Sequence, residues 1–257
     1  MAEFQWIKYE VEDGLATLTI NRAPFNVLDI QTMTEINVAL EHCGSDRSVR
    51  MLVITGVGER AFSAGVEVAD HTPDKVNDMI DTFHGIFRRL ERLSIPTVAA
   101  VNGAALGGGL ELAIACDLIV AATGAKLGQP EIKLAVFPPV AAVLLPRLVG
   151  PARAMEIILG GENFTTEEGK AMGLVNRIFP KESFAGDLRA FLKPFLSLSG
   201  AALTSARHAI REAIGKPFLD ALARTEDIYL NELMTTDDAK EGLAAFLEKR
   251  KAVWSNS

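Results

Sequence analysis

The sequence predicts an α/β protein, with a strand-and-helix core of about 190 residues followed by an all-helical tail. In the first half, short apolar runs typical of strands alternate with segments of helical pattern. In the second half the pattern is mostly helical, and no low-complexity linker interrupts the chain. We therefore expect an α/β core that carries the functional residues at 1–193 and a helical region at 194–257.

The first elements are extended. Apolar and polar residues alternate over 7–11 and again over 16–20, with Asp13-Gly14 between them. This pattern predicts an N-terminal β-hairpin. Residues 51–55 form a short apolar run rich in β-branched side chains, which predicts a buried strand.

A helix follows. Thr72 can cap it, Pro73 suits its first position, and apolar residues recur at steps of three and four as far as Leu93. Pro96 then ends the pattern. Beyond it the sequence predicts a strand over 97–101, a glycine-rich turn, a helix over 110–116 and a strand over 118–122. The helical segments expected later in the chain begin near Pro151, Thr166, Ser199, Pro217 and Thr236.

The apolar stretch Thr97 to Ala122 is long enough to span a bilayer. It contains Asn102, Glu111 and Asp117, however, and charges in mid-span are expensive in lipid. We interpret it as the buried part of a core, and we expect no membrane partner.

Composition excludes several function classes. The 257 residues carry 26 basic and 33 acidic side chains, a net charge of −7, so no global field attracts a nucleic acid. Cys43 and Cys116 form no CxxC pair, and with four histidines they supply neither a disulfide framework nor a cysteine-based metal site. The N-terminus shows no export or import signal, and a cytoplasmic location is expected.

The densest chemical signal is the run Asn102 to Glu111, which contains Gly107, Gly108 and Gly109. A triple glycine before a helical pattern lets backbone N–H groups approach a ligand, and such a turn can hold an anionic oxygen. It can equally be a tight strand-to-helix turn. Glu111 lies among apolar neighbours, where a carboxylate is either costly or useful.

A second carboxylate, Glu131, follows Pro130, which excludes a helix interior at this point and places Glu131 on a turn. Alone it could be a surface residue. Two carboxylates from separate elements are, however, what acid–base chemistry on one small molecule requires. The small residues of Ala61–Glu67 could supply another backbone N–H or form a plain loop.

Rival motifs are weaker. Residues 56–61 match a dinucleotide fingerprint in letters, but no amphipathic helix opens after them. Ser63 and His71 lack the Gly-x-Ser-x-Gly elbow of a hydrolase. His71, His84 and His208 have no zinc-site spacing.

On these residues the sequence resembles the crotonase family, the enoyl-CoA hydratases and isomerases. The matching motifs run through nearly the whole chain: Asn21-Arg22, Ala61–Gly65, Val101–Glu111, Gly128–Glu131 and Glu241–Lys251. The resemblance implies a crotonase-type spiral of ββα units with a C-terminal helical region that forms trimers and dimers of trimers. It also implies an acyl-CoA substrate and no metal or other cofactor, since CoA is part of the substrate.

The resemblance further implies the site. The oxyanion-hole amides would be those of Val66 and Gly108, and the catalytic acids Glu111 and Glu131. Lys249 would contact the CoA phosphates, from a neighbouring subunit. The other substrate-binding positions expected are Ala64, Glu67, Val68 and Phe137.

The sequence departs from the family at 136–142, where proline and branched residues replace a glycine-rich stretch. Such replacements stiffen a loop and crowd the acyl pocket. With Gly65–His71, this segment resembles the alicyclic dienoyl-CoA hydratases of aromatic degradation.

The expected activity is a hydro-lyase acting on an enoyl-CoA or cyclic dienoyl-CoA, in fatty acid or aromatic degradation. A double-bond isomerase, which needs one carboxylate, is the first alternative. A non-catalytic scaffold or RNA-binding member of the family is the second. The acyl group, and which glutamate acts as base, stay open.

Overall fold

The computed structural model describes residues 4–256, and the chain divides into two compact units. One unit comprises the chain up to Leu93 and Thr97–Arg189; the other comprises Ser94–Pro96 and the chain from Ala190 on. The boundary expected after residue 193 lies inside helix α7, Phe184–Leu196, which crosses the observed division.

The first unit contains two sheets. The six-stranded sheet has the order β1-β2-β3-β5-β7-β10, and the four-stranded sheet has the order β4-β6-β8-β9. All pairings are parallel except β1 with β2 and β8 with β9. The strands are β1 Ile7–Glu12, β2 Leu15–Ile20, β3 Met51–Gly56, β4 Ala61–Ser63, β5 Thr97–Val101, β6 Ala104–Leu106, β7 Leu118–Ala122, β8 Lys126–Gly128, β9 Asn163–Thr165 and β10 Arg177–Phe179.

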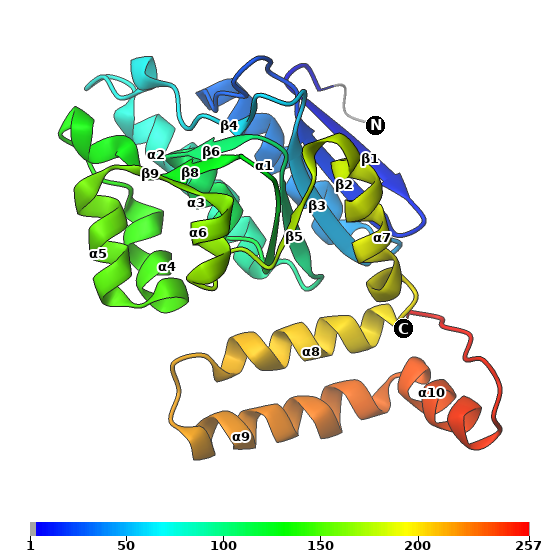
Figure 1. Cartoon of the computed structure of the whole chain (residues 1–257). Helices are drawn as coiled ribbons and strands as arrows, with labels where there is room; N and C mark the ends of the chain where they lie inside the picture. The colour runs from blue at the N-terminus through cyan, green and yellow to red at the C-terminus, as the bar shows by residue number, and fades with distance from the viewer. Residues whose placement is uncertain (1–3, 257) are drawn as a thin grey trace. The chain divides into compact units, whose positions relative to one another are not determined.

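From β3 onward the chain repeats one path. A long strand in the larger sheet is followed by a short strand in the smaller sheet and then by a helical segment: β3-β4-α2, β5-β6-α3 and β7-β8-η2. In Figure 1, β6 and β8 run across the direction of β3 and β5. This arrangement confirms the expected spiral of ββα units.

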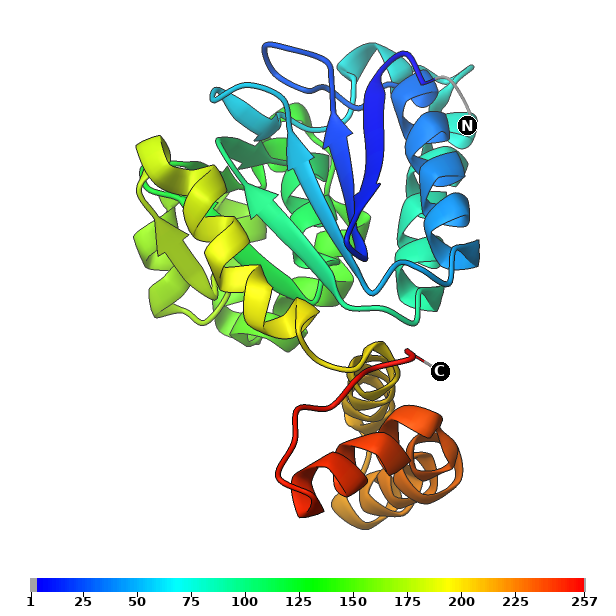
Figure 2. The same ribbon diagram turned by 90° about the vertical axis from the view of Figure 1, so that its right-hand side faces the viewer.

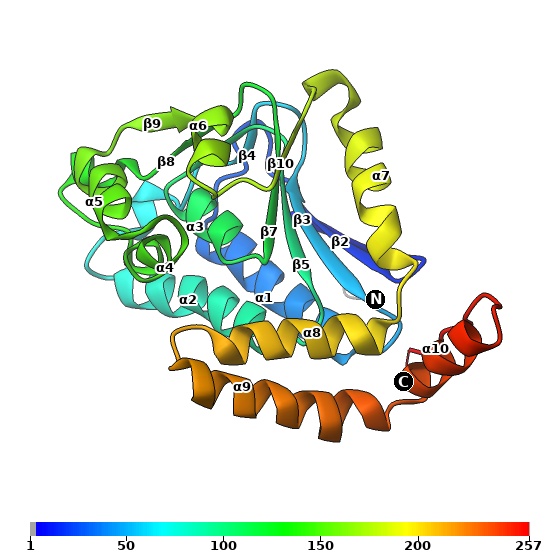
Figure 3. The same cartoon turned by 60° about the horizontal axis from the view of Figure 1, so that its bottom comes forward.

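The helices of this unit follow the strands of the spiral, and α1 and α2 lie side by side on one face of the larger sheet (Figures 2 and 3). The α-helices are α1 Ile30–Ser45, α2 Val76–Arg92, α3 Gly108–Ile114, α4 Pro139–Val149, α5 Pro151–Gly160 and α6 Thr166–Ala171. The 3-10 turns are η1 Val68–Asp70, η2 Pro130–Leu134 and η3 Lys181–Ser183.

Burial explains the strand sequences. Every residue of β5 is buried, because parallel strands in the middle of a covered sheet are apolar on both faces. The predicted hairpin is confirmed, with Asp13 and Gly14 joining antiparallel β1 and β2. Among the helices of residues 4–256, none is both long and apolar enough to cross a membrane.

Several helix predictions need correction. Helix α1 was not predicted, although Asp29 is a typical N-cap, which accepts a hydrogen bond from Thr32 N at 2.8 Å. Helix α2 begins at Val76, not at Pro73, and α3 begins at Gly108, two residues before the expected 110–116 helix. The expected stiff loop at 136–142 is in part the first turn of α4, because Pro139 starts a helix.

The second unit is helical, as predicted. It contains α8 Gly200–Ala213, α9 Phe218–Asp227, a π-helical turn η4 Ile228–Glu232, a 3-10 turn η5 Leu233–Thr235 and α10 Asp237–Leu247. Ser199 and Thr236 cap α8 and α10, and the expected starts at Pro151, Thr166 and Pro217 are also found.

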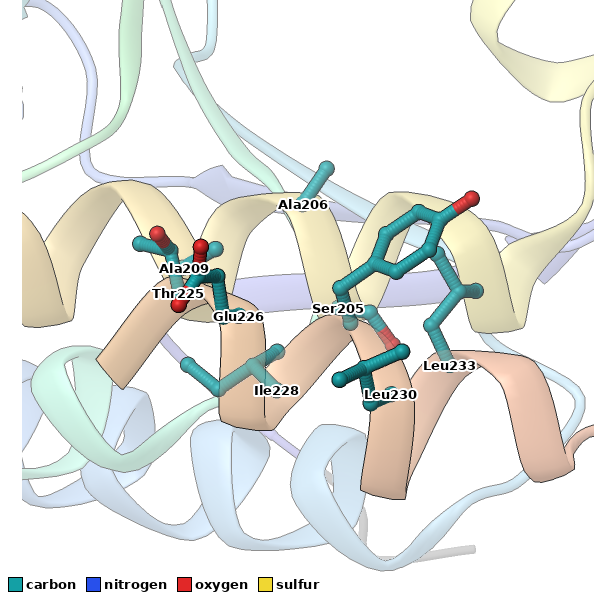
Figure 4. A pocket seen from close by; sticks show the side chains of 9 residues that line it. Ser205, Ala206, Ala209, Thr225, Glu226, Ile228, Leu230 and Leu233 are labelled. Atoms are coloured by element: carbon teal, nitrogen blue, oxygen red, sulfur yellow. The ribbon is translucent and has the colours of Figure 1, made fainter. Parts of the chain in front are cut away.

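A groove of about 600 Å³ lies within this unit, between α8 and the run α9-η4-η5 (Figure 4). Its lining is mostly apolar and includes Ala206 and Ala209 from α8 and Ile228 and Leu233 from the other side. No pair of carboxylates faces it, and Glu226 is its one acidic lining residue among those that the structure describes.

Candidate active site

The first component of the site is the free N–H of Val66. The chain leaves β4 and lies along Leu28, whose N–H donates to Gly65 O at 2.9 Å and whose carbonyl accepts from Glu67 N at 3.0 Å. Polar groups alternate in direction along an extended segment, so the amide of Val66 points away from Leu28. Within residues 4–256 no hydrogen bond from this N–H is found.

The second component is the N–H of Gly108, the first residue of α3, which has no acceptor within the helix. A Cβ atom built on Gly108 would stand 3.3 Å from Val66 N, and one built on Gly65 would stand 3.3 Å from Gly108 N. The two amides are therefore neighbours. Two adjacent N–H groups without an acceptor in the described part of the chain suit an oxygen on which negative charge develops.

Glu111 is one turn further along α3, and only 2% of it is exposed. Its Oε1 accepts hydrogen bonds from Val140 N at 2.8 Å and Ala141 N at 2.9 Å, in the first turn of α4. Glu111 thus supplies the cap that Pro138 cannot provide. Burial raises the pKa of Glu111 to about 7 and the charge of Glu131 adds to the rise, while the two amides oppose it.

Glu131 lies on η2, partly buried, and its Oε1 is 2.8 Å from where a Cβ of Gly107 would stand. The side-chain amide of the fully buried Gln129 ends 3.0 Å from both oxygens of this carboxylate, and it donates to both when its Nε2 rather than its Oε1 faces them. Burial raises the pKa of Glu131 to about 7. Glu131 therefore lies beside the start of α3, close enough to Glu111 for its charge to raise the pKa of that residue, and both carboxyls have pKa values of about 7.

Sequence reasoning gave Gln129 no role. The available signal was an amide side chain between Gly128 and Pro130, two residues before Glu131, and only the fold shows that this amide meets the Glu131 carboxylate. Glu131 itself occupies a 3-10 helix with Pro130 at its start, a tighter form of the expected turn.

The remaining predicted positions are more dispersed. Ala64 and Val68 are exposed near Val66, and Glu67 caps η1 by accepting from Ala69 N. Phe137 is 62% exposed at the start of α4. Lys249 lies in the second unit, on the turn after α10. The structure brings together Val66, Gly108, Glu111 and Glu131, and the binding roles of the others stay predictions.

The rival motifs have structural explanations. Ser63 is buried, and its Oγ accepts from Gly65 N. His71 faces the carbonyl of Glu67 through Nδ1 at 3.0 Å. Strand β4, not a helix, follows residues 56–61. Between residues 4 and 256 no group of three or more His, Cys, Asp or Glu side chains could hold a metal ion.

The raised pKa of Glu111 predicts a pH-dependent stability. Its value in the folded state, about 7, lies above the ordinary 4.5, so ionisation favours unfolding. Glu111→Gln should therefore stabilise the protein on the order of 1–3 kcal/mol near pH 8.5. This advantage should shrink as pH falls through 7 toward 4.5, where the carboxyl is protonated in both states. Urea unfolding at both ends of this range measures it, and a pH-independent difference would contradict it.

A ββα spiral with two free amides beside paired carboxylates is the arrangement of the crotonase class. The family model "Enoyl-CoA hydratase/isomerase" matches residues 10–257, and the chain belongs to this family.

Its relatives bear the names of hydratases. A cyclohexa-1,5-dienecarbonyl-CoA hydratase of Thauera aromatica is 36% identical over 96% of this chain and 95% of that protein. A crotonyl-CoA hydratase of Syntrophomonas wolfei is 35% identical over 97% of both. The crystal structure of an enoyl-CoA hydratase from Bacillus anthracis has a TM-score of 0.93 at 30% identity, covering 98% of this chain and all of that one.

Proposed function

We propose that this enzyme is a hydro-lyase that adds water to an enoyl-CoA thioester, or removes it, through an enolate. The observation that carries the proposal is the pair of carboxylates with pKa values of about 7 beside the two unoccupied amides. Near neutral pH such a pair can hold one proton between them, so that one member is a base and the other an acid.

In the proposed reaction the thioester oxygen accepts hydrogen bonds from Val66 N and Gly108 N. Each donor lowers the barrier by about 3 kcal/mol, because it meets the charge that develops on the enolate oxygen. The two glutamates hold one water. The ionised one takes a proton as the water oxygen bonds to Cβ, and the protonated one gives its proton to Cα.

The alternatives explain less. An isomerase moves a proton with one carboxylate and leaves the second without a task, although burial raises the pKa of both. A scaffold or RNA-binding role has no support in the net charge of −7. It also offers no reason to keep two carboxylates where burial opposes their ionisation.

For the substrate we propose a cyclic dienoyl-CoA. Its support is the relative named for cyclohexa-1,5-dienecarbonyl-CoA and the chain at 136–142, where prolines and Phe137 adjoin the turn that carries Glu131. The crotonyl-CoA relative supports a short straight acyl group as the competing substrate.

The experiment is to incubate the enzyme with each thioester separately and follow products by mass and by chromatography. Gain of one water from either thioester supports the hydro-lyase, and faster turnover of the cyclic diene supports the substrate. Migration of the double bond at unchanged mass would favour the isomerase. Much faster turnover of crotonyl-CoA would overturn the cyclic substrate alone.

We also propose that the enzyme needs no cofactor and works as a trimer or dimer of trimers, with Lys249 near the CoA phosphates. Large apolar side chains are exposed on the second unit, as a buried subunit interface requires. They include Phe218, Leu219, Tyr229, Leu230, Phe246 and Leu247. Cytoplasmic location stays a prediction.

A further inference from the structure

Asp70 is a buried carboxylate that the proposed reaction does not use. It ends η1, four residues after Val66, and is 7% exposed. Its Oδ2 accepts a hydrogen bond from Ile30 N at 3.2 Å. Its Oδ1 faces Lys75 Nζ at 3.3 Å, which supplies the opposite charge.

The bond between Asp70 and Ile30 is a third attachment of the segment that carries Val66, residues 65–70, to residues 28–30. Two main-chain hydrogen bonds join Leu28 to Gly65 and Glu67, one on each side of Val66. The segment then turns back, because Asp70 N donates to Glu67 O at 3.1 Å. Between residues 28–30 and residues 65–70, the bond from Ile30 N to Asp70 is the one side-chain hydrogen bond that we find in the described part of the chain.

Two carboxylates share the start of α1. Asp29 Oδ1 accepts from Thr32 N and Thr32 Oγ1, and Asp29 also pairs with Arg22. Asp70 accepts from Ile30 N, the first amide of the helix. Asp70 differs from Asp29 in that it also belongs to the segment that carries Val66. Removal of Asp70 leaves the bonds of Asp29 in place but frees that segment from Ile30.

We infer that Asp70 is a positioning residue, which fixes the direction of the Val66 N–H relative to that of Gly108. The inference rests on the proposed function, in which both amides bind the thioester oxygen. Without the link, residues 65–67 keep the two Leu28 bonds and the bond from Gly65 N to Ser63 Oγ, but they lose the attachment to Ile30, and a small rotation of this peptide misaligns the Val66 N–H. Because the developing oxyanion is more sensitive to this alignment than the ground-state thioester, the loss falls on kcat.

The test compares three variants of the two carboxylates that bind the start of α1. Asp70→Ala should lower kcat about 10–100-fold while KM for the enoyl-CoA stays within about threefold. Asp29→Ala removes the cap at Thr32 N. It should lower the free energy of unfolding as much as Asp70→Ala does, but leave kcat within about threefold of the original enzyme. Asp70→Asn keeps an oxygen acceptor for Ile30 N and should restore kcat to within about threefold of the original enzyme.

A spectroscopic readout separates alignment from general damage. The absorbance of a bound cinnamoyl-CoA should shift to the red as the two amides polarise its carbonyl, and Asp70→Ala should reduce this shift while Asp29→Ala preserves it. If Asp70→Ala does not fold, Asp70→Ser serves, because its shorter side chain withdraws the acceptor from Ile30 N.

An unchanged kcat and red shift in Asp70→Ala, or equal losses in the Asp29 variant, would overturn the inference and leave the hydro-lyase proposal standing. Failure of the original enzyme to hydrate any enoyl-CoA would overturn the proposed function. The red shift would then still decide whether Asp70 aligns the Val66 amide.

Discussion

Glu111→Gln should lower kcat about 10²–10⁴-fold, with little change in KM for the enoyl-CoA. The amide cannot take or give the proton that the reaction moves, but its oxygen still accepts from Val140 N and Ala141 N. The packing and the α4 cap are therefore preserved, and the loss belongs to the transition state. Glu131→Gln should behave alike, because both carboxylates act on the same water.

Steady-state kinetics with the thioester that the enzyme hydrates fastest provide the measurement. Glu162→Gln is the matched control. Glu162 is exposed and forms an ion pair with Lys133, and Lys133 lies on the same 3-10 turn as Glu131. This variant should keep kcat within about twofold. The double variant should lose little more than either single one, because residues that act as a unit are not additive. Intact turnover in both single variants would refute these roles and assign the proton transfers to other groups.

Local pattern and chain order explain which parts of the fold could be predicted. The Asp13-Gly14 hairpin and the caps at Ser199 and Thr236 depend on signals within a few residues. The short strands β4, β6, β8 and β9 each span three residues, too few for a hydrophobic period to register. They form a sheet only because the spiral brings successive turns together.

For the candidate site, the sequence likewise predicted single residues but not the contacts between distant ones. Gly108 and Glu111 stand in a glycine-rich run whose composition is unusual by itself, and Glu131 follows a proline that limits its backbone. Sequence did not reveal that α4 would begin at Pro139 and offer two amides to Glu111. That contact joins residues 29 positions apart. The same holds for Asp70 and Ile30, which meet only through the bridge at Leu28.

The Val66 and Gly108 amides are neighbours because Gly65, which has no side chain, packs directly against the backbone of residues 106–108. Gly65→Ala should disrupt this approach. A Cβ at this position would stand 2.9 Å from Leu106 O and 3.3 Å from Gly108 N, and φ is +104°. Both neighbours are backbone atoms, so no side-chain rotation relieves the contact. The segments that carry Val66 and Gly108 must move apart, and kcat/KM should fall about 10²–10³-fold.

Gly58→Ala is the control that separates backbone strain from this contact. Gly58 has φ of +76°, and nothing lies within 4 Å of the Cβ that alanine would add. It should lose about 1 kcal/mol of unfolding free energy through strain alone and keep its kcat/KM. Urea unfolding and steady-state kinetics of both variants give the comparison. If Gly65→Ala matched Gly58→Ala in both measurements, the close approach of residues 65 and 108 would have no catalytic consequence, and Val66 would lose its assignment as a donor to the thioester oxygen.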